Sequence, residues 1–217
     1  MKKNRKLGIT GLAAAAILGY VGILAVGRRW YTQWGTTKEE QKQPLPGDEF
    51  MDHASANHAV TINAPVEAVW PWLVQIGQDK AGFYSYTFLE NIVAAGIHNS
   101  DKIVPEWQQL EAGDFIRLGS KETYGDHPLL PVVDLEKNHY LVVKGWGAFV
   151  LQDLGNQKTR MIIRSHAQQE KIPARMLRFL LLDPIHFIME RKMLLGIKER
   201  AERHYAQQPR AMEAGNA

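Results

Sequence analysis

A short polar segment carries the residue types that acid–base or metal chemistry needs. His98, Asp101 and Glu106 fall within nine positions, with Asn99 and Trp107 beside them. An imidazole and two carboxylates at this spacing could ligate a metal ion or transfer protons as an acid/base pair. The same residues also fit a structural role, in which Asn99 and Asp101 cap a turn while His98 and Glu106 hold a loop in place. We favour the structural role, place ligand contact second, and predict no metal site.

Three aromatic residues form a second candidate cluster. Phe83, Tyr84 and Tyr86 precede a helical stretch. Rings of this kind usually pack in a core, but they can also line a cavity with a tyrosine hydroxyl directed at a ligand.

The role of two arginines depends on the register of one predicted strand. Arg160 and Arg164 alternate with Met161 and Ile163. If the arginines face solvent, they are ordinary surface charges. In the opposite register, Arg164 would hold a carboxylate at the bottom of a pocket.

Standard catalytic signatures are missing. The sequence contains no G-x-S-x-G, H-E-x-x-H, P-loop or G-x-G-x-x-G motif. It also has no cysteine, which excludes disulfide scaffolds, thiol catalysis and Cys-ligated metal sites. We predict no cofactor, and we favour a binding role over an enzymatic one while keeping the enzyme as an alternative.

The charge distribution argues against a nucleic-acid partner. The net charge is +3, but six bases and no acid lie before residue 30, which leaves the rest of the chain with 20 bases and 23 acids. Nucleic-acid binding needs bases arranged along one groove or face. Here the body is acidic, and the bases gather at its two ends.

An uncharged segment of 21 residues, 7–27, lies near the N-terminus. As a helix it would be about 31 Å long, enough to cross the ~30 Å hydrocarbon core of a bilayer. Bases flank it on both sides, and Trp30, Tyr31 and Trp34 follow it as interfacial aromatics. A cleaved signal peptide is the alternative, but the run is long and ends at Arg28-Arg29 without a small-residue cleavage site. We predict a single-pass anchor over residues 1–29, and the positive N-terminal end favours an extracytoplasmic soluble domain.

The segments beside the predicted domain are polar. Residues 30–56 contain Pro44, Pro46 and Gly47 and show no apolar periodicity, which is typical of a flexible linker. Residues 207–217 are predicted to be a disordered tail.

The domain itself, residues 57–206, has a legible order of elements. A strand at 58–64 precedes a helix at 66–77, which Pro71 should kink or split. A second helical stretch at 82–99 carries an apolar stripe that includes Phe88, Ile92 and Val93. Short β-like runs follow at 115–118, 131–136, 140–144, 147–154 and 159–166, and one long helical stretch covers 174–205, interrupted only at Asp183-Pro184. The predicted fold class is α+β, with a curved antiparallel sheet around a long C-terminal helix.

Four segments resemble bacterial members of the START-like superfamily, the helix-grip group of polyketide cyclases and lipid-transfer proteins also called SRPBCC. They are NAPVEAVWPWLVQIGQ (63–78), GFYSYTFLENI (82–92), IHNSDKIVPEWQQLEAGD (97–114) and HFIMERKMLLGIKERAER (186–203). The strand followed by A-P-x-E-x-V-W is a good indicator of this fold. The resemblance implies a deep apolar cavity between the sheet and the C-terminal helix. It implies no reaction, because carriers, receptors and enzymes share the scaffold.

Three functions fit these observations. The first, which we favour, is membrane-tethered binding and transfer of a hydrophobic small molecule or lipid in the cavity. The second is a cyclase- or hydrolase-like enzyme acting on a polyketide-like or aromatic substrate. The third is a protein-interaction module with a collapsed cavity, in which the apolar helix face of residues 176–189 docks on a membrane partner. Residues 190–203 are basic and amphipathic, which fits either a solvated helix end or contact with anionic headgroups. The ligand-binding candidates are Tyr84, Tyr86, His98, Asp101, Glu106, Trp107, Phe149, Arg164 and Phe187.

Overall fold

Apolar runs separated by turn residues form a six-stranded antiparallel sheet. The computed structural model describes residues 2–50, 53–93, 95–167 and 171–207. The strand order is β1-β6-β5-β4-β3-β2, so the first and last strands of the chain pair with each other. The strands are β1 (His53–Ile62), β2 (Phe115–Arg117), β3 (Leu129–Glu136), β4 (Tyr140–Val143), β5 (Gly147–Asp153) and β6 (Thr159–Ala167).

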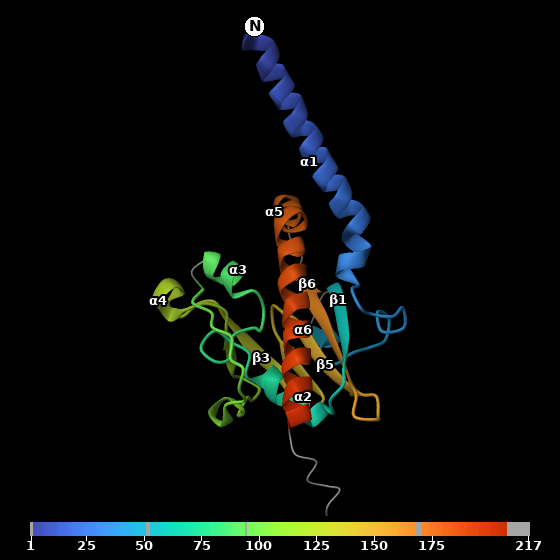
Figure 1. Ribbon diagram of the computed structural model, residues 1–217, viewed down its shortest axis with the longest axis vertical. Helices are drawn as coiled ribbons and strands as arrows, with labels where there is room; N and C mark the ends of the chain where they lie inside the picture. The colour runs from blue at the N-terminus through green and yellow to red at the C-terminus, as the bar shows by residue number, and fades with distance from the viewer. Residues whose placement is uncertain (1, 51–52, 94, 168–170, 208–217) are drawn as a thin grey trace, which may run out of the picture.

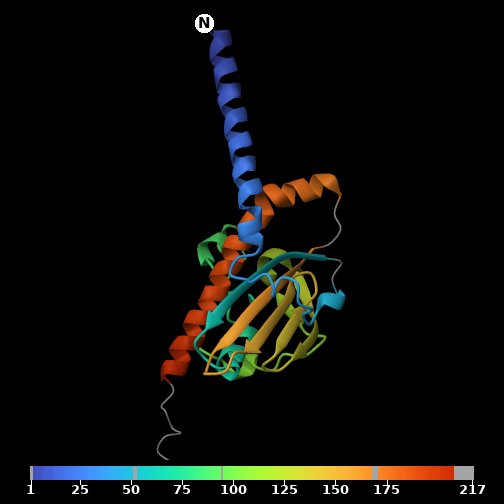
Figure 2. The same cartoon turned by 90° about the vertical axis from the view of Figure 1, so that its right-hand side faces the viewer.

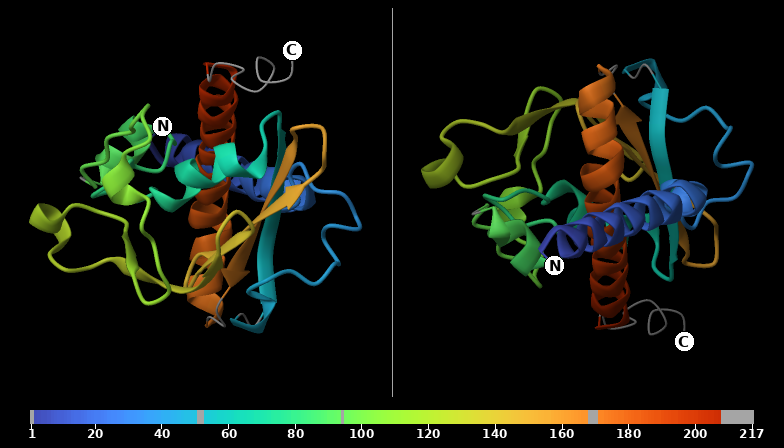
Figure 3. Two further views of the ribbon diagram at one scale, coloured as in Figure 1. Left: turned by 90° about the horizontal axis from the view of Figure 1, so that it is seen from below. Right: turned by 90° about the horizontal axis from the view of Figure 1, so that it is seen from above.

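A long C-terminal helix lies along the concave side of this sheet. Helix α6 (Asp183–Gln207) is the central element, with β1, β5 and β6 on one side and the short helices α3 (Thr87–Ile92) and α4 (Lys121–Tyr124) on the other (Figures 1 and 3). The α+β class and the curved sheet around a terminal helix are thereby confirmed, and the arrangement is consistent with a helix-grip fold.

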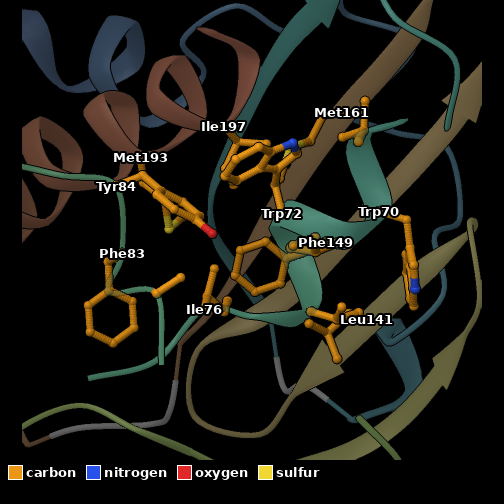
Figure 4. Packing of buried hydrophobic residues seen from close by; sticks show 14 of the residues in the cluster. Trp70, Trp72, Ile76, Phe83, Tyr84, Leu141, Phe149, Met161, Met193 and Ile197 are labelled. Atoms are coloured by element: carbon orange, nitrogen blue, oxygen red, sulfur yellow. The ribbon is translucent and has the colours of Figure 1, made fainter. Parts of the chain in front are cut away.

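The core between α6 and the sheet is built from large rings and aliphatic chains. Trp72, Tyr84 and Phe149 are fully buried there, together with Met193 and Ile197 of α6 (Figure 4). Trp72 belongs to α2 (Val66–Val74), which remains one helix although Pro71 lies inside it.

Gly196 allows α6 to pass close to the chain at Tyr84. A Cβ at this position would lie 2.8 Å from the Cβ of Tyr84, a contact too short for real side chains. Tyr84 itself has a left-handed backbone with φ of 56°, which is costly for a non-glycine residue.

The outer face of the sheet is covered by residues 33–50, a segment that falls within the predicted linker range 30–56. Leu45 packs there against Ala59, Val142, Val150 and Ile162. The cover explains why β4 and β5 are apolar on both faces, a pattern expected of strands buried on both sides.

Two arginines of β6 hold this covering segment. Arg160 donates from Nε and Nη2 to the Glu40 carboxylate at 2.7 and 2.9 Å. Arg164 binds Asp48 at 2.7 Å, Asn57 at 2.7 Å and the carbonyl oxygens of residues 40 and 43. The arginines therefore replace an apolar interface with charge-assisted hydrogen bonds.

Helix α1 (Lys2–Thr32) contains the predicted membrane segment 7–27. The side chains of residues 1–14 lie outside the described part of the structure. Over the residues that are described, no helix combines the length and apolarity that crossing a bilayer requires. Leu24 and Tyr31 of α1 are buried against Phe187 at the start of α6.

The C-terminal helical stretch bends sharply before α6. Helix α5 (Ile172–Leu177) continues into a π-helical turn, η3 (Arg178–Leu182), and α6 begins at Asp183-Pro184. Figure 2 shows α6 running at a steep angle to α5. Proline lacks a backbone donor and is tolerated in the first turn of a helix, so α6 begins anew at this point. The predicted tail begins at the last described residue, and residues 208–217 lie outside the description.

The remaining helices are short. They are α3 (Thr87–Ile92), α4 (Lys121–Tyr124), η1 (Asp48–Phe50) and η2 (Pro105–Trp107). The predicted helical stretch 82–99 is helical only over α3, and its expected apolar stripe is largely exposed, with Phe88 at 66% and Ile92 at 73%.

We expect Arg164→Ala to lower the free energy of unfolding by about 3 kcal/mol, because removing the buried guanidinium leaves buried Asn57, half-buried Asp48 and two carbonyl oxygens without their donor. Urea unfolding of the full chain in detergent, followed by tryptophan fluorescence, measures the change. The control is Lys158→Ala in the exposed β5–β6 turn, expected to cost no more than about 0.5 kcal/mol. Equal losses in the two variants would contradict the role given to Arg164.

Candidate functional site

A cavity of about 350 Å³ lies between α3, the start of α6 and the turn between β4 and β5. Its volume is at the low end of the range for pockets that hold drug-sized ligands. The walls are apolar apart from a few groups, and exposed Val93 and His186 lie at its rim. The lining residues are Phe83, Ser85, Glu90, Val93, Ala95, Ile97, Leu118, Leu130, Gly145, Trp146, His186, Met189, Glu190 and Met193.

Glu90 is the unusual polar group of this wall. Its side chain points inward from α3, the residue is only 4% exposed, and neither carboxylate oxygen has a hydrogen-bond partner. Burial raises the pKa of Glu90 to about 7, because an isolated carboxylate is poorly stabilised away from water. Ser85, by contrast, already donates its hydroxyl to the Met189 carbonyl at 2.9 Å.

Glu190, the second acid of the wall, is fully engaged. One carboxylate oxygen lies 2.5 Å from His58 Nδ1, and the other lies 2.7 Å from His186 Nε2. Ser165 Oγ donates to the carboxylate at 3.1 Å, and Trp146 Nε1 donates at 3.3 Å. We call these five residues, Glu190, His58, His186, Ser165 and Trp146, the Glu190 cluster.

The hydrogen bonds of His58 define its charge. Its Nδ1 faces the Glu190 carboxylate, and its Nε2 lies 2.7 Å from the carbonyl oxygen of Tyr31. Both ring nitrogens therefore face oxygen atoms, and with Glu190 ionised both act as donors. His58 and Glu190 thus form a buried ion pair, each with a side chain 1% exposed.

Glu190 and the half-exposed His186 shift each other's pKa. Burial alone would raise the pKa of Glu190, but the charge and hydrogen bond of His186 and the hydrogen bond of His58 hold it well below the ordinary value. Burial likewise opposes protonation of His186, yet the Glu190 carboxylate raises the pKa of that ring above 6.5. Glu190 therefore stays ionised in the folded chain.

Asn99 holds the cavity wall in place. Its side-chain oxygen accepts from the backbone of Tyr84 at 2.6 Å, and its amide donates to the Ser85 carbonyl and to the Thr87 hydroxyl. These bonds fix the start of α3 and, with it, Glu90.

The predicted polar constellation does not line the cavity. Asp101 pairs with Arg200 at 2.9 Å and Arg203 at 3.2 Å, which fastens its loop to α6. His98 and Glu106 are exposed, and Trp107 packs against the edge of the core.

The other predicted residues also lie outside the cavity lining. Tyr84 is in the core, where its hydroxyl accepts from Gln75 at 2.9 Å and burial raises its pKa. Phe149 packs on the Trp146 ring at 5.0 Å, behind the wall. The Phe187 and His58 ring centroids lie 5.4 Å apart, while Tyr86 packs edge-to-face on Phe88 with centroids 6.0 Å apart.

Arg164 lies on the opposite side of the sheet from the cavity. Its strand neighbours Met161 and Ile163 point into the core between the sheet and α6. Because side chains alternate along a strand, Arg164 points to the outer face, toward Asp48.

Sequence reasoning missed the acids and histidines of the site. The spacing of His186 and Glu190 places them one helical turn apart, which was a visible signal. Glu90 stands alone between apolar residues of a helical stretch, and His58 lies in a strand, so neither indicated the partner that the fold supplies. Within the described residues, no group of three or more His, Asp or Glu side chains is arranged to hold a metal ion.

A second hollow of about 360 Å³ lies near α2 and the β3–β4 turn. Its lining includes the exposed Glu67 and Lys137 and no buried titratable group. It offers less specific chemistry than the cavity beside α3.

No protein family model and no curated protein matches the chain. Among solved structures, the chain is similar to the solution structure of a self-sacrificing resistance protein, CalC from Micromonospora echinospora. The similarity covers 70% of this chain and 97% of that chain, at 10% sequence identity and a TM-score of 0.44. A likeness at this level carries no argument about function.

We expect Glu190→Gln to lower the free energy of unfolding by about 3–5 kcal/mol, because it leaves the buried imidazolium of His58 without its counter-charge. Urea unfolding of the full chain in detergent gives the value. The control, Glu199→Gln, alters an exposed glutamate 3.8 Å from Arg203 and should change stability by less than about 0.5 kcal/mol.

The same variant has a pH signature. The raised pKa of His186 means that its stabilising contribution is complete below pH 6.5 and is lost as pH rises through that raised pKa. Glu190→Gln should remove this loss. If Glu190→Gln has the same free energy of unfolding as the wild type, and the same loss of stability with rising pH, the pairing of His186 with Glu190 is contradicted.

Glu90→Gln tests the unpartnered acid. With its pKa raised from 4.5 to about 7, the folded chain binds more protons than the unfolded chain between these values, so stability falls as pH rises across that window. The variant should flatten this fall, while Glu122→Gln on the exposed surface of α4 should not. The measurement is the free energy of unfolding of each variant, taken at several pH values between 4.5 and about 7. If Glu90→Gln has the same pH dependence as the wild type, Glu90 is not the group responsible for the fall.

Proposed function

We propose that this protein binds a hydrophobic small molecule or single-chain lipid in the cavity between α3 and α6, and that α1 tethers the domain to a membrane. The observation that carries the proposal is the apolar cavity of about 350 Å³ with two buried acids in its wall. Its modest volume favours one chain or ring system over a two-chain lipid.

Glu90 supports a ligand that carries one hydrogen-bonding group. A buried polar group without a partner costs free energy unless something satisfies it. Ser85, Glu190 and Trp146 already have partners, so Glu90 is the lining acid with free oxygens. A hydroxyl or amine on an otherwise apolar ligand would complete the site.

The membrane tether is supported by the sequence of α1. Residues 7–27 carry no charge, and bases flank them on both sides, which is typical of a membrane-spanning helix. Four bases lie within about 15 residues on each side, and the N-terminal amine tips the balance toward an extracytoplasmic domain. Four sequence segments that resemble the START-like superfamily, together with the sheet and α6, support a helix-grip carrier or receptor.

The two alternative functions have less support. An enzyme using His98, Asp101, Glu106 or a tyrosine needs at least two of these groups at the cavity, and none belongs to its lining. An interaction module with a collapsed interior is disfavoured by the open volume beside α3.

Filling the cavity tests the proposal. Native mass spectrometry with organic extraction, on the full chain released from its own membranes, should detect a discrete apolar ligand on the wild type. Ala95→Phe places a ring into the cavity wall and should reduce ligand occupancy at least tenfold, because the added volume occupies the ligand's space.

Ala112→Phe, in an exposed loop, is the matched control and should keep wild-type occupancy. An Ala95→Phe protein that retains its ligand would place binding elsewhere. A wild type that carries none and also fails to bind a fluorescent fatty-acid probe would contradict the carrier function.

A further inference from the structure

Helix α3 is inverted relative to an ordinary surface helix. Its acid, Glu90, is buried, while Phe88, Ile92 and the following Val93 are 66%, 73% and 60% exposed. A helix in contact with water normally does the opposite. The outward residues therefore fit an apolar environment rather than solvent.

The segment α5–η3 also exposes large apolar side chains. Met176, Leu177, Leu181 and Leu182 are each about half exposed, although four large apolar side chains so close together would normally be covered. Figures 1 and 2 place α3 and α5 at the same end of the domain, the end from which α1 projects. We call the exposed apolar residues of α3 and α5–η3 the apolar end face.

Contacts with α1 set the depth of this face. The Tyr20 hydroxyl donates to the Leu180 carbonyl of η3 at 2.7 Å. Tyr20 lies seven residues before Gly27, the end of the uncharged segment, a distance of about 10 Å along a helix. Amphipathic helices that lie in the membrane interface bury their apolar side about 5–10 Å deep. If residues 7–27 span a bilayer, η3 lies at that interfacial depth.

Charged groups lie at the domain-facing boundary of the proposed interfacial layer. Arg28 follows the uncharged segment, lies 3.5 Å from Asp183 and stacks over the Phe179 ring at 5.8 Å. An arginine at this level fits the headgroup region, where its charge remains hydrated and its stem covers apolar surface.

We propose that the apolar end face inserts into the headgroup–acyl boundary of the membrane that α1 enters, so that the cavity opens toward the lipid. The rim of the cavity includes Val93, which belongs to this face, and His186, one turn beyond the bend after η3. An apolar ligand would then pass between the bilayer and the cavity without crossing water. The inference rests on the tether in the proposed function, but it is independent of ligand binding.

The absence of cysteine in the chain makes a direct test possible. Single variants Leu182→Cys and Ile92→Cys, labelled with an environment-sensitive fluorophore, report on the two parts of the face. Leu154→Cys is the matched control, because Leu154 is also about half exposed but lies at the β5–β6 turn, far from α1 (Figure 1). The labelled full chain is reconstituted into phosphatidylcholine/phosphatidylglycerol vesicles with and without spin-labelled quencher lipid.

The probes at 182 and 92 should show blue-shifted emission and at least twofold quenching by the quencher lipid, while the probe at 154 shows neither. Flotation with the vesicles is measured first, since its loss would contradict the membrane tether and this inference together. Flotation with an unquenched, water-exposed probe at 182 would overturn the inference alone. A shielded probe that responds to protein density but not to quencher lipid would also overturn it, in favour of a second copy of the chain.

Discussion

The buried carboxylate of Glu190 constrains more of this structure than any other group. Its partners come from β1, β6, the β4–β5 turn and the preceding turn of α6, and together they satisfy a charge that would otherwise be expensive to bury. Satisfying all of them requires one register of α6 against the sheet. The same register places Trp146 and His186 around the cavity, so the packing that neutralises the acid also shapes the candidate binding site.

The opposite face of the sheet depends on a different kind of interaction. Residues 33–50 are too polar to cover β4 and β5 by hydrophobic contact alone, and Leu45 is their main apolar contribution. Arg160 and Arg164 hold the backbone and acids of this segment instead. The molecule thus has an apolar layer around α6 and a charge-assisted layer outside, with the sheet between them.

Most strands could be predicted closely because alternation, apolar runs and turn residues are local signals, as the match of the predicted run 147–154 with β5 illustrates. The first strand is an exception, because β1 covers His53–Ile62 whereas the predicted strand covers 58–64. The site could not be predicted in this way. Glu90 and Glu190 line one cavity because α6 packs closely on the chain that leads into α3, with Gly196 against Tyr84, a long-range approach that no local pattern specifies. The periodicity predicts an apolar stripe that includes Phe88 and Ile92. Periodicity alone does not show whether such a stripe packs in the core or faces outward. Likewise, the composition of residues 33–50 gave no sign that two arginines more than a hundred residues later would bind them.

A hydrogen bond links the C-terminal end of α1 to the buried Glu190 cluster. The last carbonyl groups of α1 lack helical partners, and that of Tyr31 accepts from His58, whose other nitrogen holds Glu190. The position of α1 and the geometry of the cavity wall are therefore linked through the His58 ring, in addition to the packing of Leu24 and Tyr31 on Phe187. A displacement of α1 would move the Tyr31 carbonyl, and through His58 it would change the hydrogen bond that holds Glu190 at the cavity wall.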